Sequence, residues 1–411
     1  MRGARYRWTV VALLWVVALL NYLDRQVIFA VFPLLEKDLH ATSVELGLLG
    51  TAFLWIYGIL SPLGGWMADR MGRRGVILLS LGVWSTVTVL TGLARNYHEL
   101  LIARALMGIS EACYLPAALA MIADYHGGGT RSRATGLHQS GLYAGIALGG
   151  FGGGWMGAHY GWRPAFFVLG AAGLVYAAVL VAGLKEAPRQ VPRAVSGPQP
   201  PLAESLRELA GSGAFGVVVV ANALASVAYW CVYTWLALFL FERFRVSLTT
   251  AGFSSTFYIQ AASFAGILAG GWLADRWSRV NRRGRLWTQS IGLAIAGPFL
   301  LLAGTTASWW VLLPCLVCFG LGRGFFDCNL MPVVCQLVPA HLRATAYGIL
   351  NLTSCIAGGA MAAAGGWFKD HAGLGAAIQL SAVLLLIAAA ILALLRITAP
   401  RGEEWAEAEA A

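Results

Sequence analysis

The sequence predicts an all-α membrane protein with twelve transmembrane helices in two six-helix halves. Composition is the first observation: 58% of the 411 residues are hydrophobic, 12% are charged, and the mean hydropathy is +0.69. Soluble domains carry about 25% charged residues, so this composition excludes a soluble enzyme with a large core. The other two observations are a series of apolar segments long enough to cross a bilayer and a repeat that relates the two halves.

The apolar segments are about 20 residues or longer, which is the length that a helix needs to span a bilayer. Twelve of them lie near residues 8–34, 44–67, 75–94, 98–123, 133–157, 163–184, 213–241, 248–274, 284–305, 308–337, 342–368 and 372–397. Residues 185–212, rich in proline and charge, interrupt the series and predict a cytoplasmic linker with a short surface helix near 202–209. We therefore expect halves at 1–184 and 213–397, followed by an acidic cytoplasmic tail at 398–411.

Lysine and arginine placement sets the predicted orientation, because basic residues favour the cytoplasmic side of a membrane. With both termini in the cytoplasm, the predicted outside loops hold few basic residues: Lys37, Arg95, Arg163, Arg243, Arg245 and Lys369. The basic run at the N-terminus leads into 21–26, NYLDRQ, and not into a cleavage site, so the first segment is predicted to be retained. The net charge of +10 then reflects topology and implies no nucleic-acid partner.

The two halves repeat in sequence. Residues 64–70, GGWMADR, recur as GGWLADR at 270–276. Two further matches follow in the same order: Gly108, Glu111 and Pro116 with Gly324, Asp327 and Pro332, and 133–135 with 343–345. Parallel repeats of six helices are the layout of major facilitator transporters, in which the substrate site lies between the halves.

Residues 65–74, GWMADRMGRR, resemble the signature loop between helices 2 and 3 of the major facilitator superfamily. Within it, the chain is similar to the anion:cation symporters, a branch that carries organic anions and sugar acids. That similarity lies in NYLDR at 21–25, in Arg104 with Gly108 and Glu111-Ala112, and in YTWL at 233–236. The chain departs from the family in DYHGGG at 124–129 and in Arg323 and Asp327.

Charged residues inside predicted helices are the main candidates for function, because each is costly to bury in a membrane. They are Asp24, Arg25, Arg104, Glu111, Arg323 and Asp327. Arg104 and Glu111 are seven residues apart, about 10 Å along one helix face, and Arg323 and Asp327 are four apart and can pair directly. They can also be internal ion pairs that only hold helices together, and that interpretation stays open.

The family resemblance implies that Arg25 binds the carboxylate of the substrate. Arg104, an intramembrane cation of the same half, is a further candidate for substrate binding. The resemblance also implies that Asp24 and Glu111 take up and release protons, and Asp327 is the counterpart of Glu111 in the second half. We expect Arg25 to support the charged form of its neighbour Asp24, so that an anion on Arg25 eases proton uptake by Asp24. Binding of the anion and binding of the proton would then be coupled.

Polar residues of the cavity-lining helices are candidates for binding substrate hydroxyls, although each also fits a packing residue with a satisfied polar tip. They are Tyr22, Tyr57, Gln139, Tyr233 and Asn351. The membrane-embedded His138 is kept as a further candidate. The resemblance makes Asp69 a cytoplasmic latch, with Arg70, Arg73 and Arg74 as gating residues. The glycines of 141–154 are expected at close helix contacts.

The sequence thus predicts a proton-coupled symporter for a small organic anion such as a sugar acid, working by alternating access. It would be a monomer in the lipid bilayer of the cell membrane, with both termini cytoplasmic. Two alternatives stay open: a Spinster-like exporter of lysolipids, and a non-transporting nutrient receptor on the same fold. An enzyme is not expected, since no nucleophile–base set stands out, and neither a metal nor a cofactor site is predicted. The CxxC at 315–318 lacks a second ligand pair.

Overall fold

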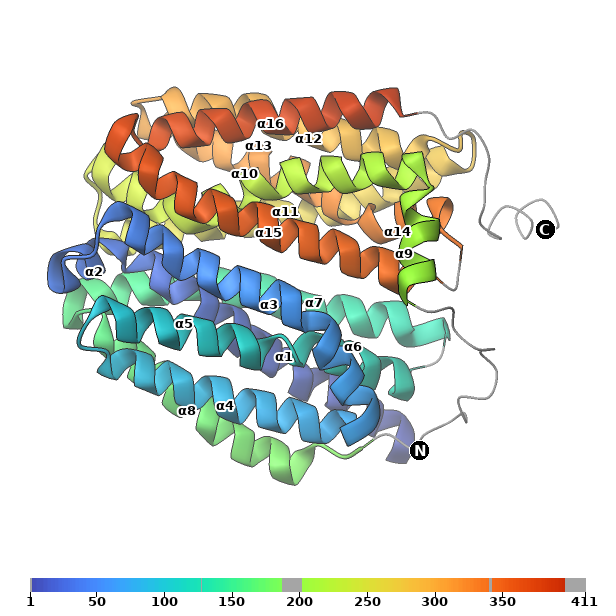
Figure 1. Ribbon diagram of the computed structural model, residues 1–411, viewed down its shortest axis with the longest axis horizontal. Helices are drawn as coiled ribbons and strands as arrows, with labels where there is room; N and C mark the ends of the chain where they lie inside the picture. The colour runs from blue at the N-terminus through green and yellow to red at the C-terminus, as the bar shows by residue number, and fades with distance from the viewer. Residues whose placement is uncertain (1, 127, 187–201, 340–341, 396–411) are drawn as a thin grey trace. The chain divides into compact units, whose positions relative to one another are not determined.

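The computed structural model describes residues 2–126, 128–186, 202–339 and 342–395, and in these residues it consists of sixteen helices without a strand. Figure 1 labels them. The helices of the first half are α1 (Arg2–Ala30), α2 (Phe32–Leu39), α3 (Ser43–Met71), α4 (Arg73–Leu93), α5 (Tyr97–Glu111), α6 (Tyr114–Tyr125), α7 (Gly128–Tyr160) and α8 (Arg163–Gly183). Those that follow are α9 (Leu202–Ala210), α10 (Gly213–Phe244), α11 (Leu248–Ser278), α12 (Gly284–Thr305), α13 (Trp309–Asp327), α14 (Leu330–Leu337), α15 (Arg343–His371) and α16 (Leu374–Leu394).

The predicted segments coincide with these helices to within a few residues. Eleven helical stretches of the described residues are long and apolar enough to cross a membrane, and α5–α6 and α13–α14 each form one of them. The twelfth predicted segment is α7, whose many glycines and polar residues lower its hydropathy. The short helix predicted in the linker is α9, whereas residues 187–201 and the predicted tail at 398–411 lie outside the described residues. The boundaries of the two predicted halves stay a prediction.

Three predicted segments are each divided into two helices, which the hydropathy pattern does not show. In two of them, α5 ends at Glu111 and α13 ends at Asp327, so the break follows the intramembrane acid in both halves. Pro116 and Pro332 explain these breaks, because each lacks the N–H that would bond to the carbonyl four residues earlier. The first segment, expected over 8–34 as one helix, is likewise divided at Val31, the residue that precedes α2 and its proline.

Glycines of α7 allow this helix to approach α1 closely, as expected from the sequence. A Cβ atom added at Gly141 would lie 2.7 Å from the carbonyl oxygen of Trp15, and one at Gly149 would lie 2.7 Å from that of Leu23. Both contacts advance in the same direction along the two helices, so α1 and α7 run parallel. This close contact fixes the face of α1 that remains for the functional side chains.

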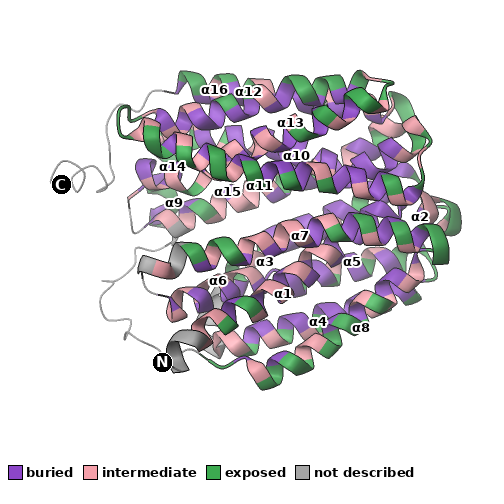
Figure 2. Cartoon of the chain, turned by 180° about the vertical axis from the view of Figure 1, so that it is seen from behind, coloured by how far each residue is buried: buried purple, intermediate pink, exposed green. Residues whose placement is uncertain are grey.

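Contacts divide the chain into two compact units. The first comprises Met1–Pro192, Tyr233–Gln260 and Gly359–His371, and the second comprises Arg193–Val232, Ala261–Gly358 and Ala372–Ala411. Trp84 of α4 lies in the core of the first unit, among apolar residues of α1, α4, α6 and α8. Figure 2 shows exposed residues interspersed along the helices. Many of them are large and apolar, among them Ile59, Ile102 and Val175, as expected of surfaces that face lipid.

Candidate functional site

An ion pair between Arg25 of α1 and Glu111 of α5 lies in the interior of the first unit. The Nε atom of Arg25 donates to Oε2 of Glu111 over 2.5 Å, and both side chains are buried. Glu111 is the last residue of α5, directly before the break that Pro116 imposes. Its second oxygen, Oε1, is buried with no hydrogen-bond partner among the described residues. The carboxylate therefore depends mainly on Arg25.

Three aromatic rings surround the Arg25 guanidinium. Its Cζ atom lies 4.6 Å from the ring centroid of Tyr22, 4.9 Å from that of Phe53 and 4.5 Å from that of Tyr57. Two of the rings, Phe53 and Tyr57, are four residues apart on α3 and stack at 5.8 Å. Cation–π contacts of this kind hold a guanidinium in place without neutralising its charge. Tyr22 and Tyr57 are candidates from the sequence for binding substrate hydroxyls, and that role stays a prediction. Phe53 was missed, although its four-residue spacing to Tyr57 could have indicated it.

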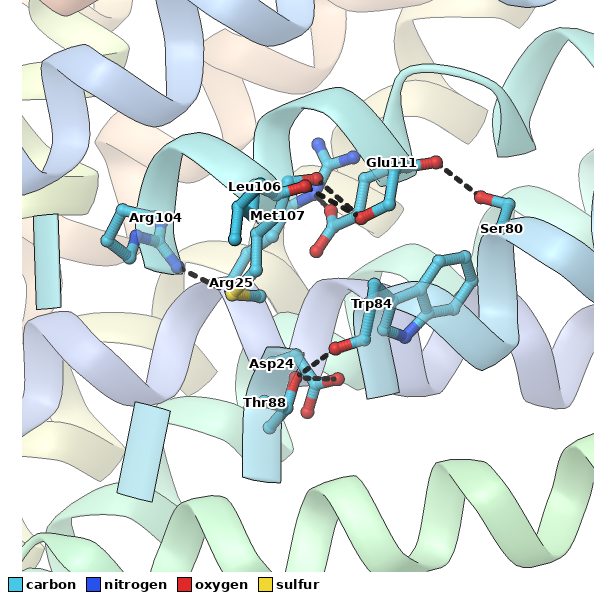
Figure 3. Close-up of polar contacts among 10 residues, drawn as sticks. Asp24, Arg25, Ser80, Trp84, Thr88, Arg104, Leu106, Met107 and Glu111 are labelled. Atoms are coloured by element: carbon cyan, nitrogen blue, oxygen red, sulfur yellow. Dashed lines mark hydrogen bonds and ion pairs between the residues drawn. The ribbon is translucent and has the colours of Figure 1, made fainter. Parts of the chain in front are cut away.

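Arg104 of α5 is a second buried cation beside the same ring. Its Cζ atom lies 4.7 Å from the centroid of Phe53, and its Nε atom donates weakly to the carbonyl oxygen of Leu49 at 3.4 Å. Its Nη1 atom contacts the sulfur of Met107 at 3.6 Å, and Nη2 is buried with no partner among the described residues. Figure 3 shows Arg104 and Glu111 along one helix, as the spacing predicted. In the described contacts, however, Glu111 pairs with Arg25 and not with Arg104.

Asp24 points away from Arg25, toward α4. Its Oδ2 atom accepts a hydrogen bond of 3.3 Å from Thr88, and Oδ1 is buried with no partner among the described residues (Figure 3). Successive residues of an α-helix are rotated by about 100°, so neighbours in sequence face different helices. The expectation that Arg25 supports the charged form of Asp24 is therefore wrong. Arg25 pairs with Glu111 instead.

The remaining candidates for hydroxyl binding are spread over both units. In the first unit, Gln26 donates to the carbonyl oxygen of Tyr233 at 3.4 Å, and Gln260 donates to its hydroxyl at 3.1 Å. Gln139 of α7 is half-buried, and its Oε1 atom has no partner among the described residues. In the second unit, Asn351 of α15 is half-buried.

The intramembrane charges of the second unit form the predicted ion pair. The Nε atom of Arg323 donates to Oδ2 of Asp327 over 3.2 Å, and its Cζ atom lies 5.1 Å from the ring of Tyr229. A carboxylate at a helix break, paired with an arginine over an aromatic ring, therefore occurs in both halves of the sequence.

Two of the predicted gating residues hold helices of the first unit together. Arg73 pairs with Asp124 and donates to the carbonyl oxygen of Ala120, while Arg74 donates to the carbonyl oxygens of Leu184 and Val181. The side chains of Asp69 and Arg70 lie outside the described residues. These contacts join α4 to α6 and to the end of α8, and the gating role of Arg73 and Arg74, like the latch at Asp69, stays a prediction.

Charged contacts at the opposite end of the first unit were not predicted. Lys369 pairs with Glu36 at 2.8 Å and with Glu242 at 3.1 Å, and Ser43 donates to Asp370 at 2.6 Å. These residues come from α2, α3, α10 and α15, so no single sequence window could have shown the cluster.

Asp38 of α2 lies at this same end. It accepts hydrogen bonds from Trp162 at 2.9 Å and from Arg163 at 2.5 Å. These two donors hold the pKa of the Asp38 carboxyl below its usual value. The interaction ties α2 to the start of α8.

A metal site is not evident in the described residues, where no three His, Cys, Asp or Glu side chains are grouped to hold an ion. The seven cysteines are all free thiols. The chemistry of the site is therefore that of two buried arginines, two buried carboxyls and aromatic rings, which is suited to binding an anion and exchanging protons.

Comparisons with known proteins find a matching family model and similar transporters. The family model described as Major Facilitator Superfamily matches residues 14–363. The chain is 25% identical to the D-galactonate transporter of Escherichia coli O6:H1 over 416 aligned residues, which cover 94% of each chain. It is 26% identical to the probable galactarate/D-glucarate transporter GudP of Bacillus subtilis, over 85% of this chain and 83% of that one.

Among solved structures, a bacterial homolog of the human lysosomal transporter Spinster, in its inward-facing and unoccupied conformation, matches with a TM-score of 0.80. The identity is 24%, and the match covers 94% of this chain and 96% of the other. At that identity the likeness shows the fold alone.

Proposed function

Because this chain belongs to the Major Facilitator Superfamily, we propose that it is a secondary active transporter that carries a small organic anion, such as a sugar acid, together with protons by alternating access. One observation carries the proposal: the buried guanidinium of Arg25 is bound by a carboxylate, Glu111, inside a ring of aromatic side chains. The relatives named as galactonate and galactarate/glucarate transporters support the substrate class.

Anion binding is coupled to proton binding because the substrate carboxylate and Glu111 compete for Arg25. Arg25 is paired with Glu111. A substrate carboxylate competes for the same guanidinium, and its binding leaves Glu111 buried without its cation. An unpaired buried carboxylate is strongly unfavourable, so Glu111 takes up a proton as the anion binds. By linkage, protonation of Glu111 releases Arg25 and strengthens anion binding to the same extent.

The neighbouring groups have supporting parts in this proposal. Arg104, whose Nη2 atom has no partner among the described residues, supplies a second positive charge for the anion. Asp24 and Asp327 are further proton sites. Substrate hydroxyls are bound by polar side chains of the set Tyr22, Tyr57, Gln139, Tyr233 and Asn351. Asp69, with Arg70, acts as a cytoplasmic latch that changes rate and not substrate choice.

The lysolipid exporter is the second candidate, and the same aromatic residues argue against it. A lipid pathway would require Tyr22 and Tyr57 to present an apolar wall. Both rings instead lie against the guanidinium of Arg25. That arrangement favours a hydrophilic anion over an amphipathic lipid. A nutrient receptor would bind the same anion without moving it, and a transport assay separates the two.

Purified protein tests the proposal directly. A thermal-shift screen against sugar acids, monocarboxylates and lysolipids identifies the ligand class, because a ligand that binds only the folded state raises the unfolding temperature. Counterflow of the best ligand in proteoliposomes then tests transport. Stabilisation by lysolipids alone would reject the anion transporter, and binding without counterflow would favour the receptor.

We further propose that the protein is a monomer in the cell membrane with both termini in the cytoplasm, as the placement of basic residues indicates. Reporter fusions at each terminus, one type active only in the cytoplasm and one only outside it, test this orientation.

A further inference from the structure

Two fully buried side chains of the first unit, Tyr114 of α6 and His138 of α7, form a hydrogen-bonded pair that the proposed function does not use. The hydroxyl of Tyr114 donates to the carbonyl oxygen of Leu14 on α1 over 2.8 Å. The same hydroxyl oxygen lies 2.9 Å from Nε2 of His138. Neither side chain is more than 1% exposed.

These two contacts fix the position of the histidine proton. A phenol has one proton and a carbonyl can only accept, so the Tyr114 proton is directed to Leu14. Nε2 of His138 must then carry the hydrogen that it shares with the Tyr114 oxygen. A neutral imidazole has a single N–H, which leaves Nδ1 as a bare acceptor. That atom is buried and has no hydrogen-bond partner among the described residues.

The Tyr114–His138 pair is bonded to α1 at Leu14, which precedes Arg25 on that helix, and Asn21 lies between these two positions along the chain. Leu14 and Asn21 are seven residues apart and so share one face of α1. Asn21 lies beside Glu111, although neither of its amide atoms has a hydrogen bond of good geometry among the described residues. Helical carbonyls point toward the C-terminus and side chains lean toward the N-terminus. The rise from Leu14 to Asn21 is roughly 10 Å along α1, and the Asn21 side chain leans toward the Leu14 end of it.

We propose that His138 is the proton relay between Glu111 and the cytoplasmic end of the first unit, an inference that rests on the proposed function. The proton leaves the Glu111 carboxyl, crosses by one or two water molecules at Asn21, and binds the lone pair of Nδ1. Glu111 becomes a carboxylate again and pairs with Arg25, while His138 becomes an imidazolium. The proton then leaves from the same Nδ1 to cytoplasmic water. The Nε2 proton stays in place, because the chain through Tyr114 ends at a carbonyl that cannot pass a proton on.

The groups around His138 suit a transient charge. Helices α1, α6 and α8 pack against α7, and the hydroxyls of Tyr22 and Tyr176 interact electrostatically with that of Tyr114. The Tyr176 hydroxyl donates to the carbonyl oxygen of Leu13 over 2.9 Å. Two buried carboxyls of the first unit, Glu111 and Asp24, are bonded to Arg25 and Thr88 and, among the described contacts, not to His138. The proposed relay therefore requires His138 to be protonated only transiently.

The variant His138→Gln tests the relay, since glutamine can still donate to Tyr114 but cannot carry a proton. Counterflow of a sugar acid and uptake driven by a pH gradient are measured on the same proteoliposomes. We expect counterflow to be retained and gradient-driven uptake to fall by about a hundredfold, the lower end of the contribution of a positioned proton donor. The matched control is His126→Gln. That buried histidine has both ring nitrogens bonded, to Thr130 and to the Arg7 carbonyl, each at 3.1 Å, and its loss should leave the ratio of the two rates unchanged.

Three outcomes would overturn the relay: unchanged gradient-driven uptake, a parallel fall of both rates, or the same selective loss in His126→Gln. If His138→Gln does not fold, His138→Asn is measured in its place against the same outcomes. Glu111→Gln is assayed in parallel to separate this inference from the proposed function. Loss of gradient-driven uptake in Glu111→Gln but not in His138→Gln rejects the relay alone. A wild-type protein without gradient-driven uptake rejects both.

Discussion

At the residue scale, the arginine of the site is held by two kinds of contact that differ in what a substrate can replace. The aromatic rings of Tyr22, Phe53 and Tyr57 position the guanidinium, and Glu111 neutralises it. A substrate carboxylate can replace the second contact without disturbing the first. The charged residues of the site are evident in the sequence, but the expected partner of Arg25 was Asp24. Adjacency in sequence was misleading, since adjacent helical residues face different directions.

Arg25→Ala should abolish anion binding, and Arg25→Lys should restore it only in part, because a lysine point charge replaces a planar guanidinium with several donors. Truncating one partner of a buried charged pair costs about 2–5 kcal/mol, so we expect affinity to fall by about thirtyfold or more. Binding is measured by isothermal calorimetry on purified protein. The exposed Arg95 gives the matched control Arg95→Ala. Near-normal affinity in Arg25→Ala would remove this residue from the anion site.

The pH dependence of stability should include a contribution from Asp38. Its pKa is lowered in the folded protein by the hydrogen bonds from Trp162 and Arg163. A lowered folded-state pKa adds stability above the unfolded-state pKa, and this stability is lost as the pH falls through the folded-state value. We expect the unfolding temperatures of the wild type and Asp38→Asn to differ at neutral pH and to converge in acid. A difference that persists at the lowest pH would contradict this assignment.

At the scale of the elements, proline and glycine determine the helix geometry that the site requires. Pro116 ends the hydrogen bonding of α5 near Glu111, and Pro332 does the same near Asp327. The apolar pattern predicted the extents of the helices well because burial in lipid dictates it. It did not predict the breaks, because a hydropathy window measures the polarity of side chains. The backbone hydrogen bond that a proline removes does not appear in it. The cluster around Lys369 escaped prediction for another reason, since its members are far apart in the chain.

The contact between α1 and α7 should make Gly141→Ala destabilising. A methyl group at Gly141 would lie 2.7 Å from the Trp15 carbonyl oxygen, whereas one at Gly136 of the same helix has no neighbour within 4 Å. Overpacking of this kind costs about 1–3 kcal/mol, while replacing a helical glycine by alanine gains about 0.5–1 kcal/mol. Thermal unfolding in detergent should therefore occur at a lower temperature in Gly141→Ala and at an equal or higher one in Gly136→Ala. Equal stability of the two variants would argue against the close contact.

At the scale of the whole molecule, both halves of the sequence end a broken helix with an acid, but the two acids differ in their partners. Glu111 is paired with an arginine from another helix, α1, whereas Asp327 is paired with Arg323 one turn earlier on its own helix. A pair within one helix is unaffected by movement between helices. The pair that joins two helices is the one that a substrate can open, so proton coupling should depend on Glu111 more than on Asp327.

Glu111→Gln tests that dependence, because an amide mimics the protonated carboxyl permanently. The variant should still bind the anion and exchange it across a liposome membrane, since exchange requires no net proton movement. It should lose accumulation driven by a pH gradient. If Glu111 were only a structural partner of Arg25, the amide would leave a buried arginine without its counter-ion, a serious defect, and folding yield and exchange would fall together. If accumulation survives in Glu111→Gln, the coupled proton is carried by Asp24 or Asp327 instead. Asp327→Asn, measured on the same proteoliposomes, would then distinguish those two.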